Sequence, residues 1–305
     1  MIDKKQQITP LVKGLNRLSS DNMKLQFWGV RGTVPVAGKK TVHYGGNTCC
    51  VSLRIGKELF IFDGGTGIRE LSNYLLAQNQ LPISAKIFIS HPHWDHINGL
   101  PFFCPFYMIS NKFEIICSDH PTLTTEQIIF SQMNPIYFPV SNKEFLADIK
   151  FRPIKAEVFM LDDVRVQSIY LAHCELCLGY RIDYQNKSFC YICDNELYLE
   201  TSPHYSQNDF EQLLELVKES TYLVIDSTYT DEEYASKENW GHSCISRVTI
   251  LADQAKVKTL CLYHHDPYQT DLDIEKKLKQ AKFALKTLRS KTRCICPREG
   301  DSLTF

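Results

Sequence analysis

The fold is decided by the stretch KIFISHPHWDH at residues 86–96. Its first five residues are mostly apolar, which predicts a buried strand at 86–90. Three histidines and a carboxylate follow at once, where the chain turns from that strand into a helix: His91, His93, Asp95 and His96. Four ligands so close together rarely all bind one tetrahedral ion. We therefore expect them to divide between two ions roughly 3.5–4 Å apart.

Three later apolar runs also end in a potential metal ligand: His173 follows 169–172, Asp194 follows 189–193, and His264 and His265 follow 258–263. Polar side chains at the carboxyl ends of strands occupy the usual active-site position of α/β sheets. A chance cluster of surface residues is the alternative for the histidine run. Histidine is scarce enough that such a match by chance is on the order of one in a thousand, so the sequence favours a two-metal site.

Length and composition are typical of a globular protein with a substantial core. The chain has 305 residues, of which 44% are hydrophobic, and a net charge of −1. This charge excludes a broad basic field for nucleic acid, although a local basic patch stays open. No apolar signal segment or membrane-spanning run is visible. We therefore expect a cytoplasmic protein without a membrane partner, whose twelve cysteines are reduced.

Hydrophobic periodicity predicts an α/β protein. Residues 1–22 are polar and are expected to form an N-terminal extension, followed by a single domain over 23–305. Strands are predicted at 24–28, 50–55, 58–62, 86–90, 113–117, 164–169, 179–182, 188–192, 222–225 and 258–263. Helices are predicted at 68–77, 209–219, 245–256 and 271–289. The strands fall into two batches, each with helices interspersed, and no linker separates them.

Several motifs together resemble the metallo-β-lactamase-fold superfamily of metallohydrolases. Besides the histidine run they are WGVRGTVP (28–35), YGGNT (44–48), DGGTG (63–67), LGYRI (178–182), TDEEY (230–234), WGHS (240–243) and HHDP (264–267). The similarity runs from about residue 24 to residue 305 and is greatest to the branch that holds ribonuclease Z and phosphoribosyl cyclic phosphate phosphodiesterase. It implies a four-layer αββα sandwich, in which two mixed sheets face each other and helices lie outside.

The resemblance also implies how the candidate ligands are divided. One metal would be held by His91, His93 and His173, the other by Asp95, His96 and His264, with Asp194 and a hydroxide bridging them. His265 is the alternative to His264. Zn²⁺ is the expected metal, with Mn²⁺ and Fe as alternatives. Asp63 would orient a ligand histidine, and Asp226 would either do the same or cap its strand.

The resemblance further implies hydrolysis of a phosphodiester, such as a cyclic nucleotide, by attack of the bridging hydroxide on phosphorus. Catalytic roles are expected for Asp95 and for His242, which would bind a phosphoryl oxygen or protonate the leaving group. The alternative is that His242 only supports the turn into helix 245–256. Ser243 is expected to cap that helix, whose N-terminus would favour a phosphate.

Four residues are expected to contact the substrate: Asn47, Tyr137, Phe138 and Ser243. Tyr137 and Phe138 would form an aromatic lid that stacks a base or sugar, or else a packed loop. The partner is expected to be a small phosphodiester, and the sequence leaves a homodimer open.

Three other functions stay open. Ribonuclease Z-like processing of RNA 3′ ends is ranked lower, because no glycine occurs between Gly99 and Gly179 to build a flexible RNA-binding arm, and because the chain lacks the net positive charge of most RNA binders. Hydrolysis of a non-phosphate ester or thioester is a second alternative. A non-catalytic scaffold is the third, and the complete ligand set argues against it.

The paired cysteines are predicted to be ordinary buried thiols rather than a zinc ribbon. Cys190 and Cys193 lie on a predicted strand, where positions three apart face opposite sides and cannot chelate one ion together. Cys174 with Cys177 and Cys294 with Cys296 are interpreted in the same way. Cys193 also departs from the family, which often has a small residue or threonine before the bridging aspartate.

Overall fold

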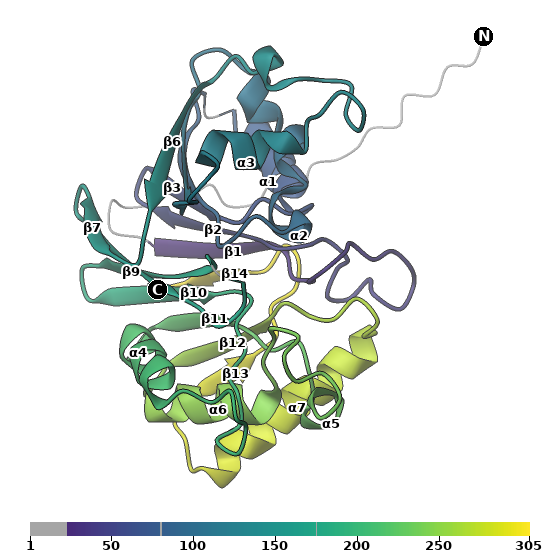
Figure 1. Ribbon diagram of the computed structural model, residues 1–305, viewed down its shortest axis with the longest axis vertical. Coiled ribbons are helices and arrows are strands. Elements are labelled where there is room, and N and C mark those ends of the chain that lie inside the picture. The colour runs from purple at the N-terminus through teal and green to yellow at the C-terminus, as the bar shows by residue number, and fades with distance from the viewer. Residues whose placement is uncertain (1–22, 80, 175) are drawn as a thin grey trace.

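A computed structural model describes residues 23–79, 81–174 and 176–305. The predicted N-terminal extension, residues 1–22, lies outside the described residues. Two β-sheets face each other across the middle of the molecule, and helices cover the outer face of each sheet (Figure 1). This is the expected αββα sandwich.

The first sheet is built mainly from the N-terminal half. Its strands are β1 (Met23–Gly29), β2 (Cys50–Ile55), β3 (Glu58–Phe62), β4 (Ser84–Phe88), β5 (Lys112–Ser118), β6 (Asp148–Ile154) and β14 (Ser302–Thr304). They lie in the order β14-β1-β2-β3-β4-β5-β6. The pairs from β14 to β3 are antiparallel, and those from β3 to β6 are parallel. The sheet is therefore mixed.

The second sheet is built from the C-terminal half and is also mixed. Its strands are β7 (Val158–Leu161), β8 (Val164–Tyr170), β9 (Leu178–Tyr184), β10 (Lys187–Ile192), β11 (Tyr222–Asp226), β12 (Thr259–Tyr263) and β13 (Arg293–Ile295). They lie in the order β13-β12-β11-β10-β9-β8-β7. Pairs from β7 to β10 are antiparallel and pairs from β10 to β13 are parallel.

The helices are α1 (Ile68–Ala77), α2 (Trp94–Ile97), α3 (Thr125–Ser131), α4 (Gln207–Val217), α5 (Asp231–Tyr234), α6 (Ile245–Gln254) and α7 (Asp271–Thr287). Short 3₁₀ turns occur at Leu100–Phe102, Cys104–Tyr107 and Asn142–Glu144. Helices α1 and α3 belong to the upper half of Figure 1, and α4 to α7 belong to the lower half.

Three apolar layers hold the sandwich together. The central one lies between the sheets and includes Phe62, Phe88 and Tyr191. The second packs the first sheet against α1, for example through Leu71. The third packs the second sheet against α4 and α6, for example through Leu213. Burial of these side chains is the main force that holds the four layers together.

The sequence predicted the central elements closely and missed the peripheral ones. Helix α1 has its predicted limits, and β2 and β3 form the predicted hairpin. The missed strands β6, β7, β13 and β14 all lie at sheet edges; β7, β13 and β14 have only three or four residues, and β6 contains a proline. The missed helix α3 has only seven residues and starts at a capping box formed by Thr124 and Gln127.

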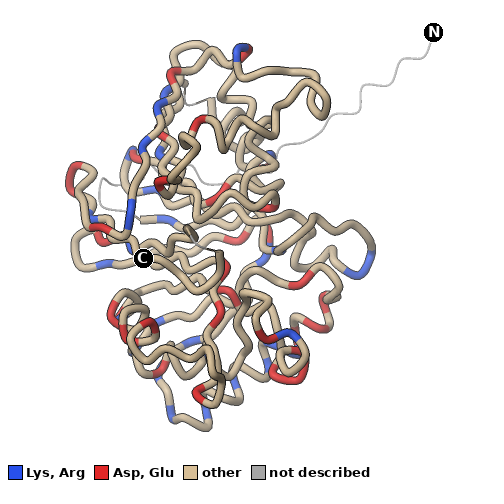
Figure 2. The backbone as a smooth tube through the Cα atoms, viewed as in Figure 1, with Lys and Arg blue, Asp and Glu red and all other residues tan. Residues whose placement is uncertain are grey.

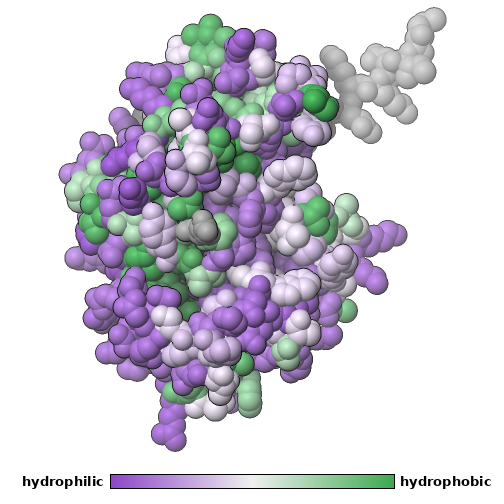
Figure 3. Space-filling model, in the orientation of Figure 1, coloured by the Kyte–Doolittle hydropathy of each residue, from purple (hydrophilic) through white to green (hydrophobic). Residues whose placement is uncertain are grey.

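The surface carries both charges interspersed. Figure 2 shows lysine and arginine mixed with aspartate and glutamate over the visible face, without one broad basic region. Hydrophobic residues on the same face are scattered among hydrophilic ones (Figure 3). None of the helices in the described part of the chain is long and apolar enough to cross a bilayer.

Candidate metal centre

The predicted ligands meet at one place, between the ends of strands from both sheets. The first sheet contributes the segment that follows β4 and enters α2, residues 89–96. The second contributes three separate strand ends, with His173 after β8, Asp194 after β10 and His264 after β12. Parallel strands present their carboxyl ends at the same edge of a sheet, which explains why residues so far apart in sequence converge.

The first donor group surrounds one oxygen of Asp194. Asp194 Oδ2 lies 3.7 Å from His91 Nε2 and 3.5 Å from His173 Nε2. His173 Nε2 in turn lies 3.2 Å from His93 Nδ1. These atoms form the predicted set of three imidazoles and one carboxylate oxygen. His93 is the exposed member, so this side of the centre faces solvent.

The second donor group surrounds the other oxygen of Asp194. Asp194 Oδ1 lies 3.3 Å from His96 Nε2 and 3.0 Å from His264 Nε2. Asp95 Oδ2 lies 3.1 Å from the same atom of His96 and 3.4 Å from that of His264. Bonds of about 2.0–2.1 Å to a tetrahedral ion place neighbouring donors roughly 3.3 Å apart. The observed separations fit such an ion.

Two buried ring nitrogens support the fit of a metal ion to these donors. Within the described residues, Nε2 of His91 and Nε2 of His96 have no hydrogen-bond partner although both are shielded from solvent. A buried polar atom without a partner is costly. A cation in this cluster would satisfy both nitrogens. Burial opposes ionisation of Asp194, but His264 and His96 outweigh it and hold the pKa of Asp194 well below its ordinary value, so this residue offers an ionised carboxylate.

Asp63, which is predicted to orient a ligand histidine, lies against His96. Its Oδ2 lies 2.8 Å from His96 Nδ1 and also accepts hydrogen bonds from Ser90 Oγ and Tyr191 Oη. Its Oδ1 accepts from the backbone N–H of Ser90. With Nδ1 engaged in this way, Nε2 of His96 is the atom that faces the second donor group.

Asp226 serves two histidines at once. Its Oδ2 lies 2.7 Å from His242 Nδ1, while its Oδ1 accepts from the Thr228 hydroxyl. The Thr228 oxygen lies 3.0 Å from His264 Nδ1, which leaves Nε2 of His264 facing the carboxylates. Burial disfavours the charged form of His242, but the Asp226 carboxylate outweighs burial and raises the pKa of His242. Thr228 was not predicted, because a threonine two residues after a strand gives no distinctive signal.

A comparison with family models gives the assignment. Residues 58–265 match the model described as the Beta-lactamase superfamily domain, which is more than half of the chain. This chain belongs to the beta-lactamase superfamily. The matched range contains all seven predicted ligands, and the two facing sheets are those of the metallo-β-lactamase fold.

The chain is similar to a ribonuclease Z in sequence and to two solved structures in fold. Ribonuclease Z of Treponema pallidum is 25% identical over 301 residues, which cover 85% of this chain and 92% of that protein. The metallo-β-lactamase-fold protein YhfI of Bacillus subtilis superposes with a TM-score of 0.66 at 16% identity, covering 93% of this chain and 100% of the other. A diphosphatase of the PhnP family superposes with a TM-score of 0.64 at 18% identity, covering 93% and 98%. The expected class, a metal-dependent hydrolase, agrees with the superfamily and these relatives.

The alternative ligand, His265, does not belong to any of the groups of neighbouring donors among the described residues. His265 is fully buried, packs edge-on against Tyr44, and both of its ring nitrogens lack a partner among the described residues. Burial, together with the charges of Lys277 and Arg31, lowers the pKa of His265 well below its ordinary value. The geometry therefore favours His264 as the ligand.

Three functional side chains sit on a left-handed backbone. The φ angles are 58° at Asp63, 56° at Asp194 and 58° at His264. Non-glycine residues adopt this conformation at a cost, and such strain is concentrated at functional sites. Close approach also requires two glycines, because a Cβ at Gly32 would collide with the His264 ring and one at Gly241 with the His173 ring.

Glu196 is a site residue that the sequence did not indicate. This buried carboxylate accepts hydrogen bonds from the backbone N–H groups of Asn239 and Gly241 and from the Tyr234 hydroxyl. It therefore fixes the loop that leads into His242. Its position two residues after Asp194 was the available signal.

The predicted role of Ser243 needs correction. The N-cap of α6 is Cys244, not Ser243. The Ser243 hydroxyl is fully buried, donates to the carbonyl of Asn195 and accepts from the backbone N–H of Leu197. It has no free side for a substrate. One N–H at the helix start is also engaged, because Ser246 N donates to the Asp231 carboxylate.

Asn47 is also placed differently from the prediction. Its side-chain amide donates to Glu299 Oε2, and its backbone N–H donates to Glu299 Oε1. The side chain therefore ties the 44–48 loop to the C-terminal segment instead of facing the donor groups. The motif around Asn47 indicated the family correctly but not the partner of this side chain.

The two residues of the predicted aromatic lid have different surroundings in the structure. Tyr137 is 80% exposed, whereas Phe138 packs edge-on against Phe102 with ring centroids 5.4 Å apart. Two further exposed aromatic side chains are neighbours of site histidines in the sequence, Trp94 next to His93 and Trp240 two residues before His242. Neither was predicted as a site residue, because the histidines of the same motifs give the stronger signal.

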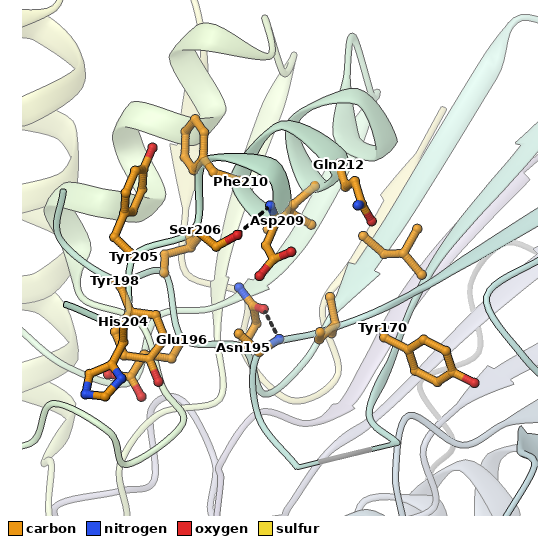
Figure 4. A pocket seen from close by; sticks show the side chains of 15 residues that line it. Tyr170, Asn195, Glu196, Tyr198, His204, Tyr205, Ser206, Asp209, Phe210 and Gln212 are labelled. Carbon is orange, nitrogen blue, oxygen red and sulfur yellow. Dashed lines mark hydrogen bonds between the residues drawn. The ribbon is translucent and has the colours of Figure 1, made fainter. Parts of the chain in front are cut away.

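Two cavities border the centre. One, of about 300 Å³, is mainly apolar, and Pro92, His93, Ile128, Cys174 and Leu176 are among its lining residues. The other, of about 230 Å³, lies behind the strand ends of β8 and β10 (Figure 4). In it the side-chain oxygen of Asn195 accepts a hydrogen bond from the backbone N–H of Ala172, which joins the strand end of His173 to that of Asp194.

Proposed function

We propose that this chain is a metal-dependent phosphodiesterase with two cation positions. The proposed ligands are His91, His93 and His173 for one position, Asp95, His96 and His264 for the other, and Asp194 between them. The complete donor set and its tetrahedral spacing support this proposal. Divalent ions bound there would supply Lewis acidity toward the phosphoryl oxygens and an activated water.

The observation that carries the choice of phosphodiesters is the position of His242. Its ring stacks on His264 with centroids 4.8 Å apart and lies 5.3 Å from the ring of His173. It therefore borders both donor groups without belonging to either proposed ligand set. Because Nδ1 is bound to Asp226, Nε2 is the atom left for a substrate.

His242 is thus suited to hydrogen-bond a phosphoryl oxygen or to give a proton to a departing alkoxide. Asp226 favours the protonated ring that either role requires. Glu196 and Gly241 hold the preceding loop against His173, so the imidazole is positioned before the substrate arrives. Asp95, whose carboxylate also accepts from the backbone N–H of Thr33, is fixed in the same way.

The substrate class proposed is a cyclic nucleotide or another small phosphodiester. The mainly apolar cavity of about 300 Å³ beside His93 gives room for the organic group of such a molecule. The exposed side chains of Trp94 and Tyr137 are available to stack on a base or sugar.

RNA 3′-end processing is the second candidate, and the similarity to ribonuclease Z of Treponema pallidum favours it. Charge argues against it, because basic and acidic residues are mixed over the surface (Figure 2). The glycine-free segment 100–178 also folds into strands β5 to β8, helix α3 and short turns among its described residues. We therefore rank the small diester first.

The test is a substrate screen with metal-reconstituted protein. The panel comprises bis-p-nitrophenyl phosphate, cyclic mono- and dinucleotides, a transfer-RNA precursor, a β-lactam and a thioester, and Asp194→Ala serves as the metal-poor control. We expect turnover of diesters by the wild type and background rates with the control. Hydrolysis of the lactam or thioester without turnover of any diester would reject the proposal, and cleavage of the RNA precursor alone would favour the second candidate.

A further inference from the structure

Two buried thiols lie behind the second donor group. Cys49, just before β2, and Cys193, just after β10, come from opposite sheets, yet their sulfur atoms are 3.6 Å apart. Both side chains are fully buried. The two sulfurs and one ring nitrogen each of His96 and His264 all lie within 4.8 Å of one another.

We propose that Cys49, Cys193, His96 and His264 form a second coordination set, which takes a soft cation such as Cd²⁺ or Cu⁺. This set rests on the proposed metal centre and shares two histidines with it. Because His96 and His264 cannot bind two ions through the same nitrogen, the sulfur set and the oxygen-containing set with Asp95 and Asp194 exclude each other at this position.

The geometry suits ligation better than it suits a disulfide. Zinc–sulfur bonds of about 2.3 Å at a tetrahedral ion place two sulfurs roughly 3.8 Å apart, close to the 3.6 Å observed. A disulfide bond requires about 2.05 Å. The histidines are oriented for this role too, because Nδ1 of His96 faces Asp63 and Nδ1 of His264 faces Thr228. Nε2 is therefore the donor atom of both rings, and it now lies beside the carboxylates of Asp95 and Asp194.

The chemistry of the donors decides which ions would choose this set. Thiolates prefer soft ions such as Cu⁺, whereas carboxylates suit Mn²⁺ and Mg²⁺. Each thiol now donates to an oxygen, Cys49 to the Arg31 carbonyl and Cys193 to Asp194 Oδ1. Binding would replace two S–H bonds with two metal–sulfur bonds and release two protons to solvent, without oxidation or reduction. A soft ion would therefore withdraw His96 and His264 from the hydrolytic centre.

The test is a titration of reduced, chelator-treated protein with Cd²⁺, followed by ultraviolet absorption. We expect a sulfur-to-cadmium charge-transfer band that is weakened by Cys49→Ser or Cys193→Ser and absent from the double variant. Cys190→Ser is the matched control and should keep the band, because that buried thiol lies on β10, the strand that Cys193 follows, but donates to the Leu216 carbonyl. Cys49→Ala/Cys193→Ala provides a second test if the serine variant does not fold.

A wild type without the band, a double variant that keeps it, or a Cys49–Cys193 disulfide found by mass spectrometry after purification under reductant would each overturn the proposal. As a second readout, the Cd²⁺ concentration that half-inhibits Mn²⁺-dependent diester hydrolysis should be roughly tenfold or more higher in the double variant. Removal of a residue that only supports a metal ligand already lowers metal affinity about 10–100-fold, so loss of two ligands should lower Cd²⁺ affinity at least tenfold. The Mn²⁺-dependent rate of the wild type reports separately on the proposed function, since the band does not depend on catalysis.

Discussion

The two halves of the molecule share a strand plan but supply the centre in different ways. Each sheet begins with three antiparallel pairs and continues with three parallel ones. The first sheet delivers four donors from the single connection that contains His91 and His96. The second sheet delivers His173, Asp194 and His264 from three separate strand ends.

This difference determines how each set of donors is positioned. The histidine run is local, because the turn into α2 places its members once that short segment has formed. The second set depends on the register of β8, β10 and β12, and therefore on packing of the whole sheet. Replacing a ligand in the first half should affect one ion at a time, whereas a substitution that disturbs the strand register of the second sheet should affect the centre as a unit.

The largest expected effect contrasts two carboxylates. Asp194→Ala should lower occupancy of both cation positions, because Asp194 faces both donor groups, whereas Asp95→Ala should lower only one. Activity of Asp194→Ala should fall by roughly 10⁴-fold or more, since Lewis acidity is worth several kcal/mol. Elemental analysis after dialysis measures the metal content, with the exposed Asp209→Ala as control. An Asp194→Ala protein that retains two tight ions would contradict the contrast.

His242→Ala tests a residue of the second half that borders the donors without joining the proposed ligand sets. Metal content and Tm should stay near the wild-type values, while kcat on a cyclic nucleotide falls roughly 10²–10⁴-fold. The loss should shrink for p-nitrophenyl esters if His242 mainly protonates the leaving group. The exposed His204→Ala is the control. Early melting, loss of metal or a near-normal kcat on a poor leaving group would remove His242 from the mechanism.

The next contrast is between two carboxylates outside the proposed ligand sets, Asp63 in the first half and Glu196 in the second. Asp63→Asn in the first half should weaken metal binding roughly 10–100-fold, because Asp63 orients His96. Glu196→Gln in the second half should leave metal affinity nearly unchanged and lower kcat about tenfold, because Glu196 holds the loop before His242. Metal titration beside steady-state kinetics separates the two outcomes, and identical behaviour of the two variants would refute the distinction.

The aromatic segment of the first half should matter for larger substrates only. Replacing Tyr137 and Phe138 together with alanine should raise KM for cyclic nucleotides by about tenfold or more, the usual worth of base stacking. KM for bis-p-nitrophenyl phosphate should change less. Equal losses on both substrates, or a lower Tm, would instead assign the segment to packing, for which the contact of Phe138 with Phe102 is the structural basis.

The smallest expected effect concerns stability and arises at Lys277, a buried residue of the second half. Its ammonium group donates to the carbonyls of Ser227 and Thr228, and burial lowers its pKa to about 8. The unfolded chain holds this proton up to about pH 10.5. Between about pH 8 and pH 10.5 the unfolded state therefore binds more protons than the folded state. The free energy of unfolding should therefore rise with pH, by at most about 1.4 kcal/mol per unit, relative to Lys277→Met. Chemical denaturation of both proteins, freed of metal, measures the difference, and parallel pH profiles would show that the lysine does not titrate there.

The sequence predicted the first half of the centre from residue spacing alone. His91, His93, Asp95 and His96 are contiguous, so their chemistry is visible before any tertiary structure is known. His173, Asp194 and His264 were found because each follows an apolar run, and the family resemblance then divided them between two positions. All seven lie together in the structure, as described above.

What the sequence did not reveal depends on contacts between distant segments. Ser243 and Asn47 belong to motifs that predict the family, but their hydrogen bonds to Asn195 and Glu299 are set by loop packing. Glu196 and Thr228 were missed for the same reason, since their partners lie on other connections. Edge strands were missed because β13 and β14 have only three residues each, and because β6 contains Pro153, which is unfavourable inside a strand.

The placement of β14 has a consequence for how the protein is made. This strand follows β13 of the second sheet but pairs with β1 at the edge of the first. In the order of synthesis β14 comes after every strand of the second sheet, so the β1 edge of the first sheet stays unpaired with β14 until those strands have been made. Glu299, which holds Asn47, is delivered equally late. The first sheet therefore cannot complete its strand order before the strands of the second sheet have been synthesised, which couples the folding of the two halves.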